Sequence, residues 1–372
     1  MVKVVHMTSV HPPFDTRIFH KECKTLAAAG YEVVLIAPHD KDEVVDGVAI
    51  RAVPKFARRI QRMFRTAWNV YRVAKKEAAF IYHFHDPELI PYGWLLKAHG
   101  KTVVYDIHED YNTAIRQKSY LPRILRTLLA NLFALFEGLT AHAFTLITAE
   151  RYYSRHFPNG FPILNYPQVD FQDISTCPPQ NPTYPKLIYT GVVSLDRGAL
   201  NHARLLSLRD DIEVHIIGRC PLSLYEQMQA IASPHQSRLH FTGVGCHVPY
   251  EQITNSYTSG DWLAGLALFP SSPHYREKEL TKFFEYMSFG IPIICSDFPV
   301  WRELVVGQGV GLCVPPDDTT AIADAISWLL EHPAEAQAMG QRGRQAVIEQ
   351  YNWDSQARKL LALYDTLLSR SE

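Results

Sequence analysis

Residues 277–297 read EKELTKFFEYMSFGIPIICSD, and this stretch joins a helical pattern to a short apolar run. We expect a helix that begins near Leu280 or Thr281, and the apolar run at 292–295 predicts a buried strand. Apolar runs of four to eight residues without alternation are typical of parallel strands that are covered on both faces. The stretch therefore predicts one helix–strand unit of an α/β fold.

The same alternation extends from this unit in both directions along the 372 residues. A first block contains predicted strands at 2–7, 32–37, 48–53, 80–85, 102–107, 144–148 and 162–164, with predicted helices at 16–29, 58–76, 88–99 and 121–141. A second block contains predicted strands at 186–190, 213–217, 239–241, 264–268, 292–295 and 311–314, followed by helices at 319–330, 334–350 and 354–368. Two such blocks predict two doubly wound α/β sheets.

The segment 170–185 is rich in Pro, Gln, Asn and Thr, and we interpret it as the linker between two domains. The chain then divides into an N-terminal domain at 1–168 and a C-terminal domain at 169–352. A chain of 372 residues, 47% of them hydrophobic, is long enough for two cores. Ligands of doubly wound sheets bind outside the carboxyl ends of the strands, so we expect a cleft between two facing domains.

The amino-acid composition argues against some classes of function. The net charge of −1 argues against a general nucleic-acid binder, so no nucleic acid is expected as a partner. The charge is nevertheless uneven, because residues 1–165 carry +7 and the remainder carries −8, which points to a partner that meets mainly the N-terminal half. Six scattered cysteines are interpreted as reduced thiols of a cytoplasmic protein. No stretch of about 20 residues is free of charge, so no membrane span is expected.

The N-terminus of the helix that begins near Thr281 is the predicted site for a ligand that contains phosphate. Free backbone N–H groups and the positive end of the helix dipole can hold a diphosphate, and Lys282 adds a cation in the first turn. Glu285 follows one turn later, where its carboxylate can accept hydrogen bonds from both hydroxyls of a ribose. Glu277, in the preceding loop, would face a sugar. The alternative interpretation is a surface helix with a Lys–Glu pair.

The whole string resembles the Glu-x7-Glu signature of the family 4 retaining glycosyltransferases, with Glu277 and Glu285 at the two acidic positions. Further segments that resemble this family stand at 11–22, 104–111, 165–167, 191–198 and 351–353. The resemblance covers nearly the whole chain and implies the GT-B fold, in which two Rossmann-like domains face each other across a cleft. It further implies that the N-terminal domain binds the acceptor, that the C-terminal domain binds a nucleoside diphosphate sugar, and that a last helix at 353–372 crosses back to the N-terminal domain.

The family resemblance and the predicted helix N-terminus together suggest catalytic and donor-binding roles for several residues. The catalytic candidates are His108, which the resemblance places beside the donor sugar, and Glu277. The donor-binding candidates are Arg197, Leu280, Thr281, Lys282 and Glu285. Many family members have Arg after the glycine that corresponds to Gly191, whereas Val192 follows it here. Phosphate neutralisation would then rest on Arg197, Lys282 and the helix N-terminus.

Polar residues at strand ends of the N-terminal half are candidates for an acceptor or cleft site, namely Asp15, Arg17, Asp86 and Glu109. For Asp15 and Arg17, a helix cap with a local ion pair is an equally good interpretation. His83 and His85 share one face of a strand, and with His108 they could form a metal site. The resemblance implies that cations and a helix dipole replace any metal, and we expect no metal and no cofactor.

Basic side chains interleaved with apolar ones run from Arg51 to Lys76 without an acidic residue. A second basic group, at 116–126, precedes the leucine-rich segment 128–133. Basic amphipathic segments favour anionic lipid surfaces, while the alternative is that the apolar residues pack on the sheet and the charges are merely solvated. We hypothesise that an anionic membrane surface is a partner and that the protein is peripheral at the inner face of the plasma membrane.

The sequence thus predicts a hexosyltransferase that moves a sugar from a UDP- or GDP-linked donor to a glycan or lipid-linked acceptor with retention of the α configuration. No carboxylate pair resembles a glycosidase dyad, so stabilisation of the leaving group is the expected main catalytic effect. Two alternatives stay open. A nucleotide-sugar 2-epimerase of the same fold would need no acceptor, and a non-catalytic subunit would bind sugar nucleotides without turnover.

Overall fold

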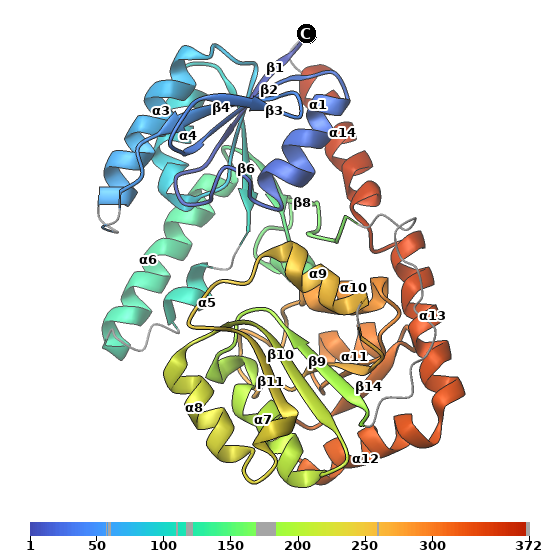
Figure 1. Cartoon of the computed structure of the whole chain (residues 1–372). Helices are drawn as coiled ribbons and strands as arrows, with labels where there is room; N and C mark the ends of the chain where they lie inside the picture. Colours follow the sequence, from blue (N-terminus) through green and yellow to red (C-terminus); the bar gives the residue numbers. More distant parts are fainter. Residues whose placement is uncertain are drawn as a thin grey trace. The chain divides into compact units, whose positions relative to one another are not determined.

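The computed structural model describes residues 1–56, 58, 61–108, 111–116, 122–168, 184–258 and 260–369. The chain divides into two compact units (Figure 1): Met1–Asn165 with Trp353–Glu372, and Tyr166–Asn352. All but the last two residues of the predicted linker at 170–185 lie outside the described part of the chain. Among the described residues, no helix has both the length and the apolar character needed to cross a membrane.

The first unit is built on an eight-stranded sheet with the strand order β3-β4-β2-β1-β5-β6-β7-β8. Its strands are β1 (Lys3–Met7), β2 (Glu32–Pro38), β3 (Glu43–Val45), β4 (Val48–Val53), β5 (Ile81–Phe84), β6 (Thr102–Ile107), β7 (Thr145–Thr148) and β8 (Phe161–Pro162). All neighbours are parallel except β3 and β4. Each predicted strand of this block is present, although the one expected at 162–164 is reduced to the two residues of β8.

Helices cover both faces of this sheet. One face packs against α3 (Ala67–Lys76) and α4 (Ile90–Ala98), whereas the other packs against the π-helical turn η1 (Ile18–Cys23), α1 (Lys24–Ala28) and α14 (Trp353–Ser369). Successive strand residues point to opposite faces, so Val4 and Val5 enter different cores. The remaining elements are η2 (Arg62–Thr66), η3 (Pro87–Leu89), α5 (Tyr111–Arg116), α6 (Arg123–Ala141) and η4 (Arg151–Arg155).

Helix α14 belongs to the first unit, although the whole second unit precedes it in the sequence. Its first residue, Trp353, donates a hydrogen bond from Nε1 to Thr25 Oγ1 at 2.9 Å. The Gln356 side chain accepts a hydrogen bond of 3.0 Å from the backbone N–H of Leu164. Buried apolar residues of the same helix complete the core on this face, among them Leu360, Leu363, Tyr364 and Leu367. The first unit is therefore assembled from two distant parts of the chain.

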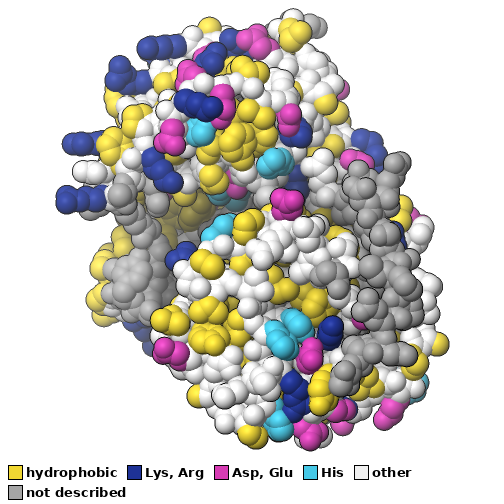
Figure 2. All heavy atoms as spheres, in the orientation of Figure 1, with side chains coloured by type: hydrophobic (Ala, Val, Ile, Leu, Met, Phe, Trp, Pro, Cys, Tyr) yellow, Lys and Arg dark blue, Asp and Glu magenta, His cyan; other side chains and the backbone are white. Residues whose placement is uncertain are grey.

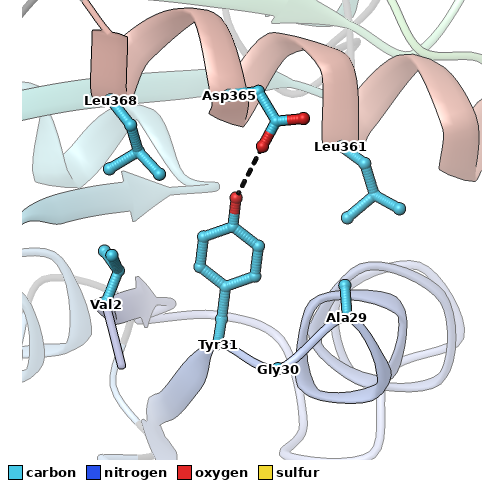
Figure 3. A pocket seen from close by; sticks show the side chains of 7 residues that line it. All are labelled: Val2, Ala29, Gly30, Tyr31, Leu361, Asp365 and Leu368. Atoms are coloured by element: carbon cyan, nitrogen blue, oxygen red, sulfur yellow. Dashed lines mark hydrogen bonds between the residues drawn. The ribbon is translucent and has the colours of Figure 1, made fainter.

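A pocket lies between α14 and the start of β1 (Figure 3), lined by Val2, Ala29, Gly30, Tyr31, Leu361, Asp365 and Leu368. The Tyr31 hydroxyl donates a hydrogen bond to Asp365 Oδ1 at 3.2 Å. The pocket lies at the amino end of β1, whereas ligands of doubly wound sheets bind beyond the carboxyl ends of the strands. We therefore assign it no part in the candidate site.

The second unit contains a six-stranded sheet, all parallel, in the order β11-β10-β9-β12-β13-β14. Its strands are β9 (Lys186–Thr190), β10 (Glu213–Cys220), β11 (Leu239–Val244), β12 (Trp262–Ala267), β13 (Ile293–Ser296) and β14 (Gly311–Val314). Its helices are η5 (Leu195–Arg197), α7 (Ala199–Leu208), α8 (Leu222–Ile231), η6 (Gln236–Arg238), α9 (Tyr250–Thr258), α10 (Thr281–Ser288), α11 (Pro299–Val305), α12 (Thr319–Glu331) and α13 (Pro333–Glu349). The helix–strand unit expected at 280–295 is thus present as α10 and β13.

Candidate active site

The turn that follows β9 positions Arg197 at the carboxyl end of the second sheet. Gly198 adopts a φ of 76°, and a Cβ atom there would lie 2.0 Å from the carbonyl oxygen of Leu268. Only glycine fits such a close approach of two backbone segments. The Arg197 guanidinium donates from Nε to the Tyr275 hydroxyl at 3.1 Å, and this hydroxyl donates to Asp196 at 3.1 Å. Arg197 is therefore held by its neighbours rather than extended into solvent.

Lys282 lies in the first turn of α10, and its side chain is buried. The residue is 7% exposed, and its ammonium nitrogen lies 3.7 Å from the centroid of the Tyr189 ring and 5.1 Å from that of Phe269. This nitrogen has no hydrogen-bond partner among the described residues. Burial, and secondly the positive charge of Arg197, lower the pKa of Lys282 well below its ordinary value. Two basic side chains, those of Lys282 and Arg197, thus interact at the start of α10.

The N-terminus of α10 adds backbone donors to these two cations. Leu280 occupies the position before the first helical residue, and no side chain caps the helix there. Leu280 itself is buried and Thr281 is exposed. Uncapped N–H groups at a helix N-terminus form a site suited to anions. The residues predicted from the 277–297 string are therefore brought together with Arg197, which comes from the turn after β9.

Glu285 is oriented by a tyrosine that the sequence did not reveal as part of the site. The Tyr257 hydroxyl, on α9, donates a 2.7 Å hydrogen bond to Glu285 Oε2 and lies 2.8 Å from Thr190 Oγ1. Burial raises the pKa of Tyr257 well above its ordinary value, so the phenol stays protonated and able to donate. Glu285 is only partly buried. The Tyr257 hydrogen bond therefore orients the Glu285 carboxylate.

Glu277 lies in the loop before α10 and is partly exposed. Trp301 donates a 2.7 Å hydrogen bond from Nε1 to the backbone carbonyl of Lys278, the next residue of this loop. Trp301 itself is fully buried against Phe283 and Phe298. The core of the second unit thus anchors the loop that carries Glu277.

In the first unit, His108 follows β6 and lies beside Asp106. Its Nε2 atom is 2.5 Å from Asp106 Oδ2, and Tyr153 donates a hydrogen bond to its backbone carbonyl at 3.2 Å. The His108 side chain is 9% exposed. Although burial opposes it, the charges of Arg17 and His108 hold the pKa of Asp106 well below its ordinary value. Asp106 is therefore a carboxylate that orients the His108 ring.

Arg17 and Asp15 have different partners within the first unit. The Arg17 guanidinium is buried and donates two hydrogen bonds to Asp106, of 2.8 Å from Nε and 2.9 Å from Nη2. Asp15 Oδ1 accepts hydrogen bonds from the backbone N–H groups of Arg17 and Ile18, at 2.9 and 3.0 Å. Asp15 thus acts as a cap for η1, as the alternative interpretation expected, and Arg17 forms ion pairs both with Glu22 of the same turn, at 3.2 Å, and with Asp106.

Asp86 is buried directly after β5 and holds the loop that follows β1. Its Oδ2 atom accepts hydrogen bonds from the Thr8 hydroxyl at 2.8 Å and from the backbone N–H of Ser9 at 2.6 Å. His11, in the same loop, lies 3.4 Å from Asp86 Oδ1. Glu109, the fourth candidate for the acceptor side, lies outside the described residues. A contact of Asp15, Arg17, Asp86 or Glu109 with an acceptor stays a prediction.

Two family descriptions match the chain. Residues 178–346 match the family described as "Glycosyl transferases group 1", and residues 16–155 match "Glycosyltransferase Family 4". The two matched ranges coincide with the second unit and with the main part of the first.

Individual relatives that resemble parts of the chain are named as glycosyltransferases as well. The lipopolysaccharide core biosynthesis mannosyltransferase LpsB of Rhizobium meliloti is 27% identical over 110 residues, which are 29% of this chain and 31% of that protein. A protein of Mycobacterium tuberculosis, named as a GDP-mannose-dependent alpha-(1-6)-phosphatidylinositol monomannoside mannosyltransferase, is 36% identical over 78 residues, which are 21% of this chain and 20% of that protein. The chain thus matches about a third or less of the length of these relatives.

Solved structures resemble the chain over its full length. Sucrose-phosphate synthase from Thermosynechococcus elongatus aligns with a TM-score of 0.78 at 18% identity and covers 100% of both chains. HepE of Anabaena, crystallised with UDP and glucose, aligns with a TM-score of 0.70 at 11% identity over 98% of this chain and 100% of that one. At such identities the likeness concerns the fold alone, and it confirms the prediction of a GT-B fold.

Proposed function

The chain belongs to glycosyltransferase family 4, and on this premise we propose that it moves a sugar from a nucleoside diphosphate sugar to a glycan or lipid-linked acceptor, with retention of the α configuration. The observation that carries the proposal is the buried ammonium of Lys282, which has no hydrogen-bond partner in the described part of the chain. Burying an unpaired charge is costly. A cation held in this way beside Arg197 and the uncapped start of α10 suits a diphosphate.

In the proposed reaction, the bond between the anomeric carbon and the diphosphate breaks. An acceptor hydroxyl oxygen forms the new bond to that carbon, and its proton passes to an oxygen of the departing diphosphate. Negative charge then grows on the departing diphosphate, so cations fixed in advance stabilise the transition state more than the ground state. Lys282, Arg197 and the N–H groups of α10 would supply this stabilisation.

The other candidates complete the proposed site. Glu285, oriented by Tyr257, would accept hydrogen bonds from the ribose hydroxyls of the donor. His108 and Glu277 would lie beside the transferred sugar, a role that the family resemblance suggests for His108 and that its place before α10 suggests for Glu277. Asp106 fixes the ring of His108, which supports a positioned hydrogen bond between that ring and the sugar. These roles stay proposals for each residue.

The names of the relatives guide the choice of donor. The Mycobacterium tuberculosis relative is named as GDP-mannose-dependent, and the Rhizobium meliloti relative is named as a mannosyltransferase. We therefore propose GDP-mannose as the first donor to test. HepE was crystallised with UDP and glucose, so UDP-glucose is the second.

The test incubates the full chain with GDP- and UDP-linked hexoses, with and without lipid-linked acceptors, and measures release of the nucleoside diphosphate. Transfer with an α-linked product, read by nuclear magnetic resonance of the anomeric proton, supports the proposal. A changed sugar nucleotide without acceptor would instead identify a 2-epimerase. Tight nucleotide binding without turnover for any donor and acceptor would identify a binding subunit.

We also propose that the acceptor is reached at an anionic membrane surface on the cytoplasmic side, through the first unit. Helix α6 carries an apolar stripe at helical spacing, and five of its members are 61% to 85% exposed: Ile124, Leu128, Leu132, Leu135 and Leu139. An apolar helix face that remains exposed to water is typical of an interaction site. Arg123 and Arg126 lie in the first turn of the same helix.

Basic side chains around α3 support the same proposal. Arg65, Arg72, Lys75 and Lys76 are exposed on η2 and α3, and Figure 2 shows Lys and Arg side chains gathered along the upper left edge of the first unit. Val70, Tyr71 and Ala74 of α3 are buried in the core, so part of this amphipathic segment does pack on the sheet. The exposed basic side chains and the apolar stripe of α6 are the parts that remain available to contact a lipid surface.

Vesicle flotation tests this surface. The wild-type chain should float with vesicles of phosphatidylcholine and phosphatidylglycerol and stay behind with phosphatidylcholine alone. The double substitution Leu128→Glu with Leu132→Glu should abolish flotation. The control Leu222→Glu, at an equally exposed apolar position on α8, should leave flotation unchanged. Indifference of the wild type to anionic lipid, or unchanged flotation of the double variant, would remove the proposal.

A further inference from the structure

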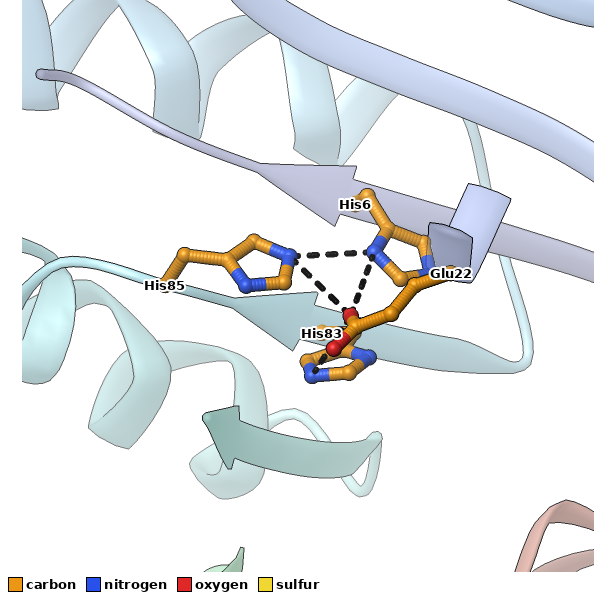
Figure 4. Close-up of side chains that lie close together, drawn as sticks. All are labelled: His6, Glu22, His83 and His85. Atoms are coloured by element: carbon orange, nitrogen blue, oxygen red, sulfur yellow. Dashed lines mark hydrogen bonds and ion pairs between the residues drawn. The ribbon is translucent and has the colours of Figure 1, made fainter. Parts of the chain in front are cut away.

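Three histidines and one glutamate lie together in the core of the first unit (Figure 4). His6 comes from β1, His83 and His85 from β5 and the residue after it, and Glu22 from η1. All four residues are fully buried. Because β1 and β5 are parallel neighbours with His6 opposite His83, their alternate side chains share one face of the sheet. That face is the one covered by η1 and α14.

The donor atoms of the four side chains converge. Glu22 Oε2 lies 3.9 Å from His6 Nδ1, 3.9 Å from His83 Nε2 and 4.0 Å from His85 Nε2. His6 Nδ1 and His85 Nε2 are 3.0 Å apart. Zinc ligands at about 2.0–2.1 Å from a tetrahedral ion are separated from one another by about 3.3 Å. The observed separations lie around this value, so small side-chain movements suffice to close a tetrahedral shell.

Hydrogen bonds within the protein do not satisfy this cluster. Both carboxylate oxygens of Glu22 and Nε2 of His83 are buried without a hydrogen-bond partner in the described part of the chain. Arg17 lies 3.2 Å from Glu22 Oε1, but its hydrogen bonds go to Asp106. A hydrogen bond between His6 and His85 satisfies one atom of each ring and leaves Glu22 and His83 as they are. A cation at the centre would satisfy all four donor atoms at once.

The outer nitrogen of each ring already has a partner, as in metal sites. His85 Nδ1 lies 3.2 Å from Asp106 Oδ2, and His83 Nδ1 lies 2.8 Å from the Tyr364 hydroxyl. His6 Nε2 lies 3.4 Å from the same hydroxyl. When the Nδ1–H of His85 donates to a carboxylate, its Nε2 lone pair points to the cluster centre. Histidines that bind metals are generally oriented in this way by carboxylates and other acceptors.

The ligand set indicates the kind of ion. Three imidazoles and one carboxylate suit Zn²⁺, whereas Mg²⁺ and Ca²⁺ prefer oxygen ligands alone. Four protein ligands in a closed core leave no open position for water, which is the pattern of a structural site.

We propose that the first unit binds one structural Zn²⁺ through His6 Nδ1, Glu22, His83 Nε2 and His85 Nε2. The ion would join β1, β5 and η1, and the Tyr364 hydroxyl would link α14 to the same centre. It would stabilise the fold without taking part in sugar transfer. From the sequence no metal is expected, and His83 and His85 are grouped only with His108, because neither the register of β1 against β5 nor the position of η1 can be read from the sequence.

The experiment measures zinc by mass spectrometry in full-length protein that is purified through a tag without histidines. One Zn²⁺ per chain is expected in the wild type. His83→Gln and Glu22→Gln should bring the content close to zero. The matched control is His215→Gln, because His215 belongs to a second His/Glu cluster with Glu213 and His240 that is only partly buried. This control should keep the full content.

Further measurements separate loss of metal from loss of fold. Substitution of the wild type with Co²⁺ should give the visible absorption of a tetrahedral complex. Tyr364→Phe keeps all four ligands and should weaken zinc affinity by about 10–100-fold, as for other outer-shell changes. A folded wild type that holds no zinc after purification or after incubation with zinc would overturn the proposal. Zinc content unchanged in both ligand variants would overturn it as well.

Discussion

Arg17 and Asp106 form a bidentate pair in the core of the first unit, although 89 positions separate them in the sequence. The pair joins η1 to the end of β6, and Asp106 in turn contacts His108 and His85. Breaking a buried ion pair by removing one partner leaves an uncompensated charge in a region of low dielectric.

Arg17→Met should therefore destabilise the first unit by about 3–5 kcal/mol. Urea unfolding followed by circular dichroism measures the loss. Arg302→Met is the matched control, since Arg302 pairs with Asp297 at the surface and exposed pairs contribute little. Its unfolding midpoint should stay nearly unchanged. Equal effects of the two substitutions would contradict a structural role for the buried pair.

Lys282→Met should remove most of the affinity for a nucleoside diphosphate. Hydrogen bonds to charged groups contribute about 1.5–3 kcal/mol, so the Kd for GDP or UDP should rise by roughly ten- to a hundredfold. Stability should be maintained or increased, because a buried unpaired ammonium is replaced by an apolar group of similar length. Isothermal titration gives the Kd, and thermal unfolding gives the stability.

Lys186→Met serves as the control for that variant, since it makes the same change in charge at the amino end of β9, away from the site. Its nucleotide affinity should equal that of the wild type. If both variants bound nucleotides as the wild type does, the diphosphate site at α10 would be rejected.

Binding of a nucleoside diphosphate should take up protons at Lys282. Burial lowers the pKa of this ammonium in the free enzyme, and a bound anion must raise it again. As the pH rises above the lowered pKa, proton uptake on binding should increase and affinity should fall. Titrations in buffers of different ionisation enthalpy measure the uptake. The prediction fails if uptake is the same in Lys282→Met as in the wild type.

Tyr257→Phe should weaken nucleotide binding only by weakening the interaction of Glu285 with the ribose hydroxyls. Loss of one hydrogen bond to Glu285 corresponds to about 0.5–1.5 kcal/mol, or up to roughly tenfold in Kd. A nucleotide without the 2′- and 3′-hydroxyls provides the control, because it cannot use the Glu285 carboxylate. Wild type and variant should bind this control nucleotide equally. An equal loss for both nucleotides would show a general structural effect instead.

Gly198→Ala should destabilise the second unit by more than the cost of placing alanine at a positive φ angle. The added Cβ atom would meet the Leu268 carbonyl oxygen at 2.0 Å, so the turn that carries Arg197 must move. Gly245→Ala is the matched control, with a φ of 69° and open space around the added atom. The control should cost about 1–2 kcal/mol, and Gly198→Ala clearly more in the same urea experiment. Equal costs would mean that conformation alone matters there.

Much of the fold could be predicted from the sequence, because buried parallel strands need apolar residues on both faces and so produce continuous apolar runs. The strands of the second unit follow such runs closely. The β3 strand was missed, since a three-residue antiparallel edge strand carries no such signal. The helix expected at 16–29 is present from residue 18, but it begins as the π-helical turn η1.

Without the family resemblance, which suggested Arg197 and His108, the candidate site was predictable only where its residues are neighbours in sequence. Lys282 and Glu285 stand on one short helix, so a local pattern reveals them. Tyr257 reaches Glu285 from α9, and Arg17 reaches Asp106 across the sheet, through packing that no local pattern encodes. His6 lies between Val5 and Met7 in β1 and reads as part of the core until the register of β1 is known.

The position of α14 also sets the order in which the protein can mature on the ribosome. The second unit has all its strands and helices in one continuous segment, so it can fold while translation proceeds. The first unit begins to emerge earlier, yet one face of its sheet is covered only by η1 and α1 until residues 353–369 have been synthesised. The half that is made first is therefore the half that is completed last.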